Sequence, residues 1–330
     1  MTGAAGFVGF HIARRLTGDG HDVLAVDSFE DNYSVDLKLA RWDELRGGAK
    51  AGAGLRQLRL DLCDYPAFSD AVTEFLPDVI LHFAARPGVR EGVNAWPKYS
   101  RSNLTGLSAV LSAAAEAPSS PVLVYASSSS VYGGSSHGES SERDQVRPIS
   151  FYGATKVAGE QLAELATQTQ GMTAVGLRMF TVYGPWGRPD MLPWRLVRAT
   201  QTGHALQLYG DGSARRDFTY IDDVVESVVR IADYSRGLDQ GSHQVFNVGG
   251  GHSVSVREAI HEVESATGRT IRIQQLVKNK SDVADTLASI EKLTAAVGFA
   301  PTIDFATGIR MTIPWFESAS DSGQLSAWDS

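Results

Sequence analysis

The amino-acid sequence predicts an α/β fold whose core is a doubly wound parallel sheet. Short apolar, β-branched runs alternate with helical patterns through the first half of the chain, and such runs are typical of strands buried on both faces. A glycine-rich turn stands directly before the first helical pattern. Because strands that alternate with helices pair in parallel through right-handed crossovers, the sheet is expected to be covered by helices on both sides.

The predicted elements follow the chain in order. Residues 6–16 form a helix with Val8, Ile12 and Leu16 on one stripe, and Gly20 ends it. Strands are predicted at 22–26, 55–60, 78–85, 121–127, 173–180 and 243–250. Further helices are predicted at 103–117, 152–170 and 218–234, and flexible loops at 47–54 and 133–143.

The composition argues against several classes of function. With 30 basic and 38 acidic residues the net charge is −8, which disfavours general binding to nucleic acid or to an anionic membrane. Cys63 is the single cysteine, so no internal disulfide can form and a cytoplasmic protein is expected. No apolar run reaches the roughly 18 residues of a membrane span. The eight histidines and Cys63 show no metal-ligand spacing, so no metal is expected.

The opening "GAAGFVG" places Gly3, Gly6 and Gly9 at the spacing of a dinucleotide-binding turn. The first glycine allows a tight turn, the second lets backbone N–H groups approach a pyrophosphate, and the third allows close packing of helix on strand. Taken alone the pattern also fits a plain loop before a helix. Asp27 ends the next strand, about 20 residues later, where a carboxylate binds the adenosine ribose and favours NAD over NADP.

Two further strand ends support this cofactor site. Asp61 follows the strand at 55–60, and "HFAA" (82–85) ends the strand at 78–85. In a doubly wound sheet both lie at the carboxyl ends of the strands, where ligands bind. We therefore expect residues 1–180 to form an NAD-binding Rossmann domain, with 218–250 returning to it. Residues 181–316 are expected to form mainly a smaller, interleaved C-terminal substrate domain, and 317–330 a disordered tail.

A catalytic site is predicted from hydroxyl, phenol and amine groups. "YGATK" sets Tyr152 and Lys156 at i and i+4 on one helix face. A free tyrosine has a pKa of about 10, and a nearby ammonium together with a nicotinamide cation would lower it. A bare Tyr-x-x-x-Lys is more often an ordinary surface pair. Here the serines at 127–130 end a strand facing the same crevice, which makes the combination specific.

These motifs resemble the extended short-chain dehydrogenase/reductases of the NAD-dependent epimerase/dehydratase family. The resemblance runs from about residue 2 to 316. It implies that Ser128 hydrogen-bonds the reacting hydroxyl, that Tyr152 acts as base and acid, and that Lys156 binds the nicotinamide ribose and favours the phenolate. It also implies further cofactor-binding residues, namely Phe7, Val8, Lys38, Leu62, Phe83, Ala84, Ala85 and Asn103.

Three stretches resemble the UDP-glucuronate 4-epimerases in particular. They are "RMFTVYGPWGRPDM" (178–191), "DNYSVDLKLAR" (31–41) and "RRDFTYIDD" (215–223). The turn "SSSSVYG" (127–133) contains no acid, whereas the related dehydratases and decarboxylating enzymes carry a carboxyl group there for extra proton transfers. The resemblance therefore implies simple 4-epimerisation of a UDP-sugar through a 4-keto intermediate, with UDP-glucuronate as substrate and UDP-galacturonate as product.

A glucuronate epimerase must hold a sugar carboxylate. Arg188 can bind one through paired N–H groups, and Thr181, Ser129 and Ser130 can add hydroxyl donors; the alternative is that Arg188 forms a loop salt bridge. The resemblance places Arg216 on the diphosphate and Leu208 and Tyr209 near the uracil. It adds Met191 and the ribose-binding Asp282 to the substrate site. In "NKSDV" (279–283) Asn279 replaces the usual Gln or Arg, and Ser289 replaces a usual Asp.

Two other functions stay open from the sequence. One is a neutral-sugar 4-epimerase acting on UDP-glucose and UDP-galactose. The other is a catalytically silent nucleotide-sensing module on the same fold, although Ser128, Tyr152 and Lys156 are all present. The Ala-rich helices at 103–117 and 152–170 expose small apolar residues, and the resemblance implies a homodimer through such a helix pair.

The glycine-rich turn begins at residue 3, and only Met1 and Thr2 precede it. In the relatives a central strand leads into this turn. Burying one Val, Leu or Ile is worth about 1.5–3 kcal/mol, so losing several would cost on the order of 10 kcal/mol. We therefore expect the first β-strand to be missing from this sequence, and a chain extended upstream to melt higher and hold NAD better.

Overall fold

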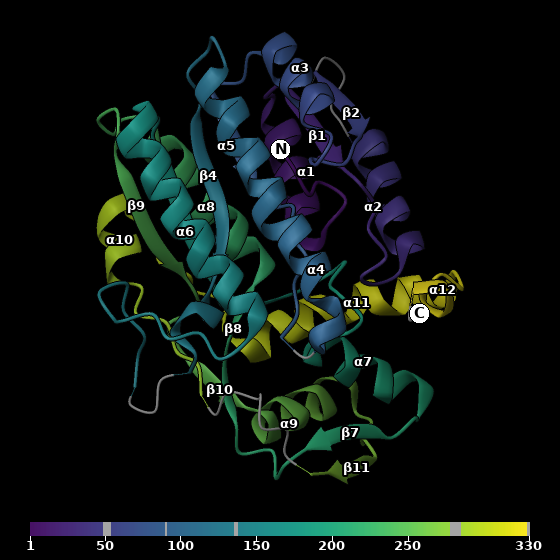
Figure 1. The fold of residues 1–330 in the computed structure, drawn as a ribbon. Helices are drawn as coiled ribbons and strands as arrows, with labels where there is room; N and C mark the ends of the chain where they lie inside the picture. Colours follow the sequence, from purple (N-terminus) through teal and green to yellow (C-terminus); the bar gives the residue numbers. More distant parts are fainter. Residues whose placement is uncertain (49–53, 90, 135–137, 278–284, 329–330) are drawn as a thin grey trace.

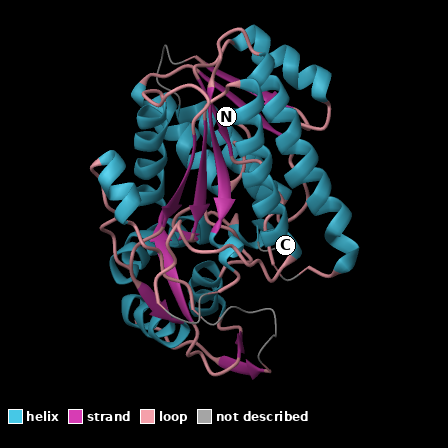
Figure 2. Cartoon of the chain, turned by 60° about the vertical axis from the view of Figure 1, so that its left-hand side comes forward, coloured by secondary structure: helices cyan, strands magenta, loops and turns pink. Residues whose placement is uncertain are grey.

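A parallel sheet with helices on both faces forms the centre of the fold (Figures 1 and 2). The structure, a computed structural model, describes residues 1–48, 54–89, 91–134, 138–277 and 285–328. The strand order is β2–β1–β3–β4–β5–β9 with Thr2 bridging β1 and β3, and every pairing is parallel. The strands are β1 Val23–Asp27, β2 Leu55–Arg59, β3 Val79–His82, β4 Val122–Ser128, β5 Ala174–Met179 and β9 His243–Val248. The predicted doubly wound α/β fold is confirmed.

The helices cover the sheet in two layers. One layer contains α1 Phe7–Asp19, α2 Val35–Gly48, α8 Ile221–Ser235 and α10 Glu291–Val297. The other contains α3 Tyr65–Phe75, α5 Gly106–Glu116 and α6 Phe151–Gln170. The short segments η1 Val93–Ala95, α4 Trp96–Tyr99 and the π-helical η2 Ser100–Thr105 lead into α5, and η3 Ser129–Tyr132 follows β4. The predicted loops at 47–54 and 133–143 include residues 49–53 and 135–137, which lie outside the described residues.

The second half of the chain adds a smaller group of elements beyond the carboxyl ends of the strands (Figure 1). It contains β6 Thr181–Tyr183, α7 Leu192–Thr202, β7 Leu206–Tyr209, β8 Arg215–Tyr220, β10 Ser253–Ser255, α9 Val256–Thr267, β11 Ile273–Leu276 and α11 Phe305–Asp321. The predicted helix at 218–234 is wrong at its start, because Phe218–Tyr220 end strand β8 and pair with β6. Phe218 and Tyr220 pack edge-on against Tyr183, and this packing outweighs the helical pattern.

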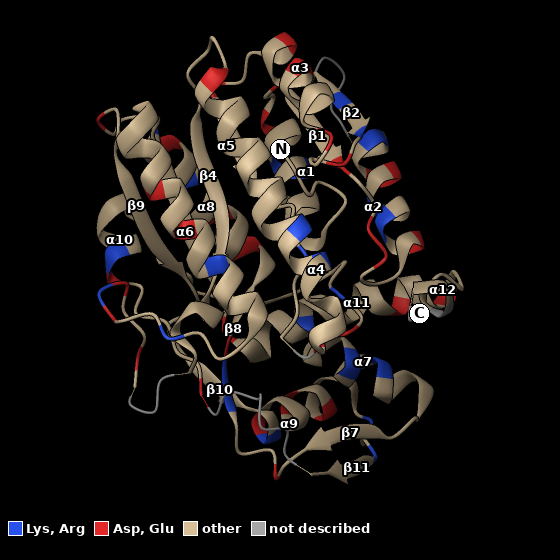
Figure 3. Cartoon of the chain, in the orientation of Figure 1, with Lys and Arg blue, Asp and Glu red and all other residues tan. Residues whose placement is uncertain are grey.

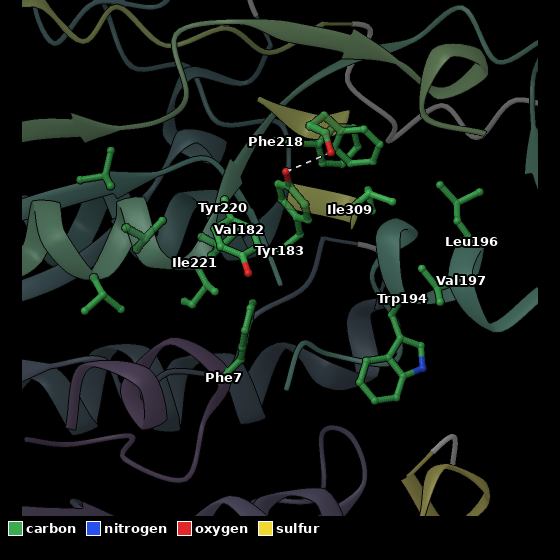
Figure 4. Close-up of a cluster of buried hydrophobic side chains, with 14 of the residues drawn as sticks. Phe7, Val182, Tyr183, Trp194, Leu196, Val197, Phe218, Tyr220, Ile221 and Ile309 are labelled. Carbon is green, nitrogen blue, oxygen red and sulfur yellow. Dashed lines mark hydrogen bonds between the residues drawn. The ribbon is translucent and has the colours of Figure 1, made fainter. Parts of the chain in front are cut away.

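One hydrophobic cluster joins the two halves of the molecule (Figure 4). It brings Phe7 of α1 together with Tyr183 of β6, Trp194 of α7 and Phe218 of β8, all of them buried. Burying a large apolar side chain stabilises a fold by about 1.5–3 kcal/mol. The elements after residue 180 therefore share a core with the parallel sheet, and the position of a domain boundary at residue 180 stays a prediction.

The predicted disordered tail at 317–330 is wrong where the structure describes it. Helix α11 continues to Asp321, and α12 Leu325–Trp328 follows. Leu325 and Trp328 are buried, and the Trp328 ring stacks on Trp315 at a centroid distance of 6.0 Å. The Ser34 hydroxyl donates a hydrogen bond to the carbonyl of Ala327. Burial of Leu325 and Trp328 thus fixes a segment whose average composition is polar. Residues 329–330 lie outside the described part.

Met1 and Thr2 lie between β1 and β3. The Val26 N–H donates to the Met1 carbonyl at 2.8 Å, and the Thr2 N–H donates to the Leu81 carbonyl at 2.9 Å. The Phe83 N–H in turn donates to the Thr2 carbonyl. Met1 and Thr2 thus pair with β1 and β3 as the last residues of a central strand would. From the sequence, such a strand is expected directly before the glycine-rich turn.

Arg41 of helix α2 ties the cofactor turn to the second half of the chain. Its side chain is fully buried, and its guanidinium donates to the carbonyl of Ala5 at 3.0 Å. The same group donates to the carbonyls of Trp186 at 2.6 Å and Gly187 at 2.9 Å, and to the Tyr33 hydroxyl at 2.6 Å. Because all of these acceptors depend on a single planar donor, Arg41 fixes the loop that carries Arg188 against the glycine-rich turn.

We expect Arg41→Lys to lower the free energy of unfolding by at least about 2 kcal/mol. An ammonium cannot reach all three carbonyls, and a buried acceptor left without its donor costs about 1–3 kcal/mol. Urea unfolding followed by circular dichroism measures the change. Arg46→Lys on the exposed side of the same helix is the control and should shift stability by no more than about 0.5 kcal/mol. Equal stability of the two variants would show that Arg41 does not carry this junction.

Candidate active site

A cavity of about 790 Å³ lies between the carboxyl ends of the parallel strands and the second half of the chain. This volume is within the usual range for ligand pockets. The predicted cofactor residues that line it are Gly3, Gly6, Phe7, Val8, Gly9, Asp27, Lys38, Asp61, Leu62, Phe83, Ala84, Ala85, Tyr152 and Lys156. The predicted catalytic residue Ser128 also lines it, as do the predicted substrate residues Ser129, Ser130, Thr181, Arg188, Met191, Leu208, Tyr209 and Arg216. The structure thus brings the two predicted sets together in one cavity.

The glycine-rich turn leaves no room for side chains at two of its positions. Gly3 has a φ of +72°, and a Cβ there would lie 2.6 Å from the backbone N of Ala84. A Cβ on Gly9 would overlap the carbonyl oxygen of Gly3. Helix α1 begins after Gly6 without a side-chain cap, and its first residues line the cavity, so the amino end of the helix borders the cavity as in a pyrophosphate site. This cradle fits a dinucleotide.

The ribose end of the cradle is set by Asp27 and Lys38. The Asp27 carboxylate accepts hydrogen bonds from the backbone N–H groups of Ala5 at 2.9 Å and Phe29 at 2.8 Å, which fix its position at the end of β1. The Lys38 ammonium donates to the carbonyl of Glu30 and to the Asn32 side-chain oxygen. Burial lowers the pKa of Lys38 to about 8, although the charge of Asp27 opposes the shift. These groups can hold the hydroxyls of an adenosine ribose.

Asp61 and Asn103 are placed differently from one another. Asp61 lines the cavity at the end of β2 and forms a salt bridge with Arg101 at 2.5 Å. Asn103, in the π-helical segment, is buried behind the cavity wall. Its side chain accepts from the Arg86 N–H and donates to the Arg86 carbonyl and to the Thr155 hydroxyl. The structure therefore gives Asn103 a supporting position between α6 and the loop after β3 rather than a place among the cavity-lining residues.

Ser128, Tyr152 and Lys156 come from two adjacent elements. Ser128 ends strand β4, where its hydroxyl accepts from the Ser130 N–H at 3.1 Å, and this side chain lies close enough to the Tyr152 phenol to lower its pKa. The Lys156 ammonium donates to the Ala126 carbonyl at 2.8 Å and lies 5.8 Å from the centre of the Tyr152 ring. The predicted catalytic groups are thus close together at the end of one strand.

Gly153 allows helix α6 to approach this strand end. A Cβ at this position would lie 2.6 Å from the Ser130 carbonyl oxygen. The Ser150 hydroxyl caps the helix by accepting from the Gly153 N–H at 3.0 Å. Close contact and cap together set where α6 begins, and they bring the Tyr152 phenol to Ser128.

The pKa of Tyr152 differs from the sequence-based expectation. Burial raises it above its ordinary value, while the Ser128 hydrogen bond and the positive charge of Arg188 oppose the shift. Burial also lowers the pKa of Lys156 to about 8, and the negative charge of Glu160 opposes that shift. Burial, which disfavours the phenolate, therefore outweighs the two groups that lower the pKa of Tyr152, and Lys156 is not one of these groups.

A buried ion pair lies directly behind the catalytic groups. Glu160, one helical turn after Lys156, accepts from the Arg178 guanidinium at 2.9 and 2.7 Å and from the Ser127 hydroxyl at 2.5 Å. Arg178 also donates to the Tyr132 hydroxyl at 3.0 Å. The network joins α6 to β4 and β5, so it fixes the strand end that carries Ser128. A Tyr-x-x-x-Lys-x-x-x-Glu spacing in the sequence is the signal that could have identified Glu160.

Arg188 faces the cavity from the loop after β6, but its guanidinium is already paired. Its Nε and one terminal nitrogen donate to the two carboxylate oxygens of Asp190 at 3.0 and 2.6 Å. The structure thus shows the loop salt bridge that the sequence leaves as the alternative. Burial would lower the pKa of Arg188, but the charge and hydrogen bonds of Asp190 outweigh it, so the pKa is raised.

The far end of the cavity carries further polar and cationic groups, and Figure 3 marks the Lys and Arg positions along α7 in blue. Arg216 of β8 and Arg195 of α7 both line it, as do Leu208 and Tyr209 of β7. Arg195 and Asp190 were not identified from the sequence. Asp282 and Asn279 lie outside the described residues, so the predicted ribose contact of Asp282 stays a prediction.

Neither a metal site nor a membrane span is found in the part of the chain that the structure describes. There, no group of three or more His, Cys, Asp or Glu side chains is arranged to hold a metal ion. Among the helices of the same residues, none is long and apolar enough to cross a membrane.

Comparisons with known proteins point to one family. The model of the NAD dependent epimerase/dehydratase family matches residues 1–249. A probable UDP-glucuronate 4-epimerase of Rhizobium meliloti (strain 1021) is 35% identical over 96% of this chain and 96% of its own length. MoeE5, solved with UDP-glucuronic acid and NAD, is 33% identical with a TM-score of 0.83 over 96% of this chain and 98% of its own. MoeE5 has also been solved with UDP-glucose and NAD.

A second solved structure is similar over the same range. The UDP-glucuronic acid 4-epimerase from Bacillus cereus, in complex with UDP-glucuronic acid and NAD, has a TM-score of 0.86 and 30% identity. The superposition covers 96% of this chain and 98% of that one.

We expect Gly9→Ala to lose bound NAD, because the added methyl would overlap the Gly3 carbonyl and open the turn. The NAD content of the purified protein, measured after denaturation, tests this. Gly18→Ala is the matched control, since it lies on the same helix with open space around it. It should keep NAD and change stability by no more than about 1 kcal/mol. Full NAD content in Gly9→Ala would rule out the turn as the cofactor cradle.

We expect Glu160→Gln to shift the alkaline limb of the pH–rate profile to lower pH. Lys156 is charged below about pH 8 and neutral above it, so activity that needs the ammonium falls as the pH rises through that value. The Glu160 carboxylate favours the ammonium, and removing its charge lowers the pKa of Lys156 further. Measured kcat/KM between pH 6 and 10 tests this, with Glu164→Gln on the same helix as the control. If the alkaline limb of the Glu160→Gln profile stays at the wild-type pH, the Glu160 carboxylate does not control the pKa of Lys156.

Proposed function

The chain belongs to the NAD-dependent epimerase/dehydratase family, and on that basis we propose that it is an isomerase that interconverts UDP-glucuronate and UDP-galacturonate through a 4-keto intermediate. One observation carries the proposal. The Ser128–Tyr152–Lys156 group and the cavity-facing Arg188 line the same cavity as the dinucleotide cradle. A sugar carboxylate and its reacting C4 hydroxyl can therefore be held at the same time beside the cofactor.

Tyr152 is proposed to take the proton of the C4 hydroxyl and later to return it. The Ser128 side chain lies beside its phenol and lowers the pKa of that phenol, so both oxygens are available to the same substrate hydroxyl. The positive charges of Lys156 and Arg188 favour the phenolate against the effect of burial. NAD, when bound, supplies the redox partner that oxidises C4 and later reduces it.

The carboxylate of the sugar is proposed to lie against Arg188, Thr181, Ser129 and Ser130. A guanidinium binds a carboxylate through two parallel hydrogen bonds, which fix its orientation. The 4-keto acid formed on the way is a β-keto acid. It loses CO₂ when the bond between C5 and the carboxylate is aligned with the π system of the C4 carbonyl. Holding the carboxylate out of that alignment lets the chain invert C4 without decarboxylation.

The rest of the substrate is proposed to extend along the far end of the cavity. Arg216, which lines the cavity on β8, is suited to the diphosphate. Leu208 and Tyr209 are suited to the uracil, and Met191 to the sugar. Residues 181–316 would thus supply most of the substrate side, and residues 1–180 with 218–250 most of the cofactor side.

We propose a cytoplasmic homodimer formed through α5 and α6, which lie side by side in the helix layer that also contains α3 (Figure 1). Leu165 of α6 and Trp96 at the start of α4 are large apolar side chains exposed by 54% and 44%. Trp96 stacks on Phe151 at 4.6 Å, which gives a flat apolar surface. The single cysteine is consistent with a reducing compartment.

A neutral-sugar 4-epimerase is the second candidate, and the Arg188–Asp190 pair favours it. Because Asp190 already neutralises Arg188, a sugar without a carboxylate leaves no unpaired charge in the cavity. Activity on UDP-glucose is therefore compatible with the same site.

The proposal predicts that denatured protein releases NAD and that the native protein converts UDP-glucuronate to its C4 epimer faster than UDP-glucose in a competition assay. We expect Tyr152→Phe to lower kcat by about 10²–10⁴-fold while NAD stays bound. Tyr65→Phe is the control. This exposed phenol lies at the start of α3 and donates a hydrogen bond to Glu116 at the end of α5. Absence of any C4 epimer from folded, NAD-containing protein would refute the proposal.

A further inference from the structure

The Arg188–Asp190 pair differs from an ordinary surface ion pair in the burial of its two members. The Arg188 side chain is 17% exposed and that of Asp190 is 52% exposed. The pair is bidentate, with both carboxylate oxygens bound to one edge of the guanidinium. Both residues line the cavity that also contains Tyr152. Arg188 is thus a fixed, largely buried charge, whereas its partner borders on water.

The groups around Arg188 make a carboxylate partner necessary. Lys38 and Arg41 lie close enough for their positive charges to interact unfavourably with it. The Tyr33 ring lies 5.6 Å from the Arg188 guanidinium carbon and contributes a cation–π contact. A buried charge without an opposite partner is costly, so Arg188 is expected to keep a carboxylate at all times.

A sugar carboxylate that approaches Arg188 along its Nε edge would compete with Asp190 for the same donors. A carboxylate that binds a guanidinium in a bidentate manner uses two parallel N–H donors, and here the Nε edge is taken by Asp190. The exchange of one carboxylate for another keeps Arg188 paired. Asp190, being half-exposed, can turn to water at low cost, whereas Arg188 cannot.

We propose that Asp190 is a specificity-determining residue that holds Arg188 until the carboxylate of the sugar displaces it. The inference rests on the proposed function and goes beyond it. Asp190 weakens the binding of an acidic sugar, because its own bonds to Arg188 must first break. It also permits a neutral sugar, because Arg188 then stays paired with Asp190. The balance between the two substrate classes is set by this residue.

The test is Asp190→Asn, which keeps the shape of the side chain and removes the competing charge. In this variant Arg188 lacks a carboxylate until an acidic sugar arrives. We expect UDP-glucuronate to bind about tenfold more tightly, which corresponds to about 1.4 kcal/mol. UDP-glucose is expected to bind no more tightly than to the wild-type protein. Titration calorimetry of the NAD-containing protein measures both dissociation constants.

Asp19→Asn is the matched control. Asp19 is paired with Arg15 at 2.6 Å at the exposed end of helix α1, so this change removes the same charge from an arginine–aspartate pair outside the cavity. It should leave both dissociation constants unchanged and so exclude an effect of net charge alone.

The outcomes separate the inference from the proposed function. If the wild-type protein epimerises UDP-glucuronate but Asp190→Asn binds it equally or more weakly, Asp190 supports Arg188 and the inference is wrong. Equal tightening for UDP-glucose would also overturn it, since the effect would not depend on the carboxylate. If the wild-type protein neither binds nor converts UDP-glucuronate, the proposed function is wrong and the inference is wrong with it.

Discussion

The fold depends on the fixed position of one loop relative to the cofactor turn, and Arg41 provides it. The loop from Gly184 to Asp190 carries Arg188 on one side and packs on helices α1, α11 and α12 with the other. Three of its carbonyls point to side chains from the first fifty residues: His11 bonds Pro185 at 2.9 Å, and Arg41 bonds Trp186 and Gly187. Since Arg41 also bonds Ala5, the distance between cofactor turn and substrate loop is set by one guanidinium.

The packing around Trp186 explains why the C-terminal segment is part of the same unit. Trp186 has a φ of +59°, an uncommon conformation for a residue other than glycine. Its ring contacts Phe10, Trp315 and Trp328 at centroid distances of 5.3 to 5.4 Å. The helices α11 and α12 therefore close the side of the loop that faces away from the cavity. A local backbone strain at Trp186 is offset by the packing of these four rings, of which Phe10 and Trp328 are buried.

Much of the site follows from local spacing in the sequence, and the rest depends on contacts between distant residues. The glycine spacing, Asp27 and the Ser128, Tyr152 and Lys156 positions follow from short motifs. Arg41 could not be recognised in this way, since its partner Trp186 lies 145 residues further along the chain. The same holds for the raised pKa of Tyr152, because burial is set by tertiary packing. The polar average composition of the tail predicts disorder. It does not account for the burial of Leu325 and Trp328, which fixes helix α12.

Two arginine–carboxylate pairs of the site, Glu160–Arg178 and Arg188–Asp190, have opposite consequences because they differ in burial. Glu160 and Arg178 are 10% and 7% exposed, and Ser127 and Tyr132 complete their hydrogen bonds. Opening that pair would leave charges without water or partners, at a cost of several kcal/mol, so it acts as a fixed support for the catalytic strand end. In the Arg188 pair only the arginine is enclosed. Its carboxylate can be released to solvent provided that another carboxylate takes its place, and a substrate that carries one is such a replacement.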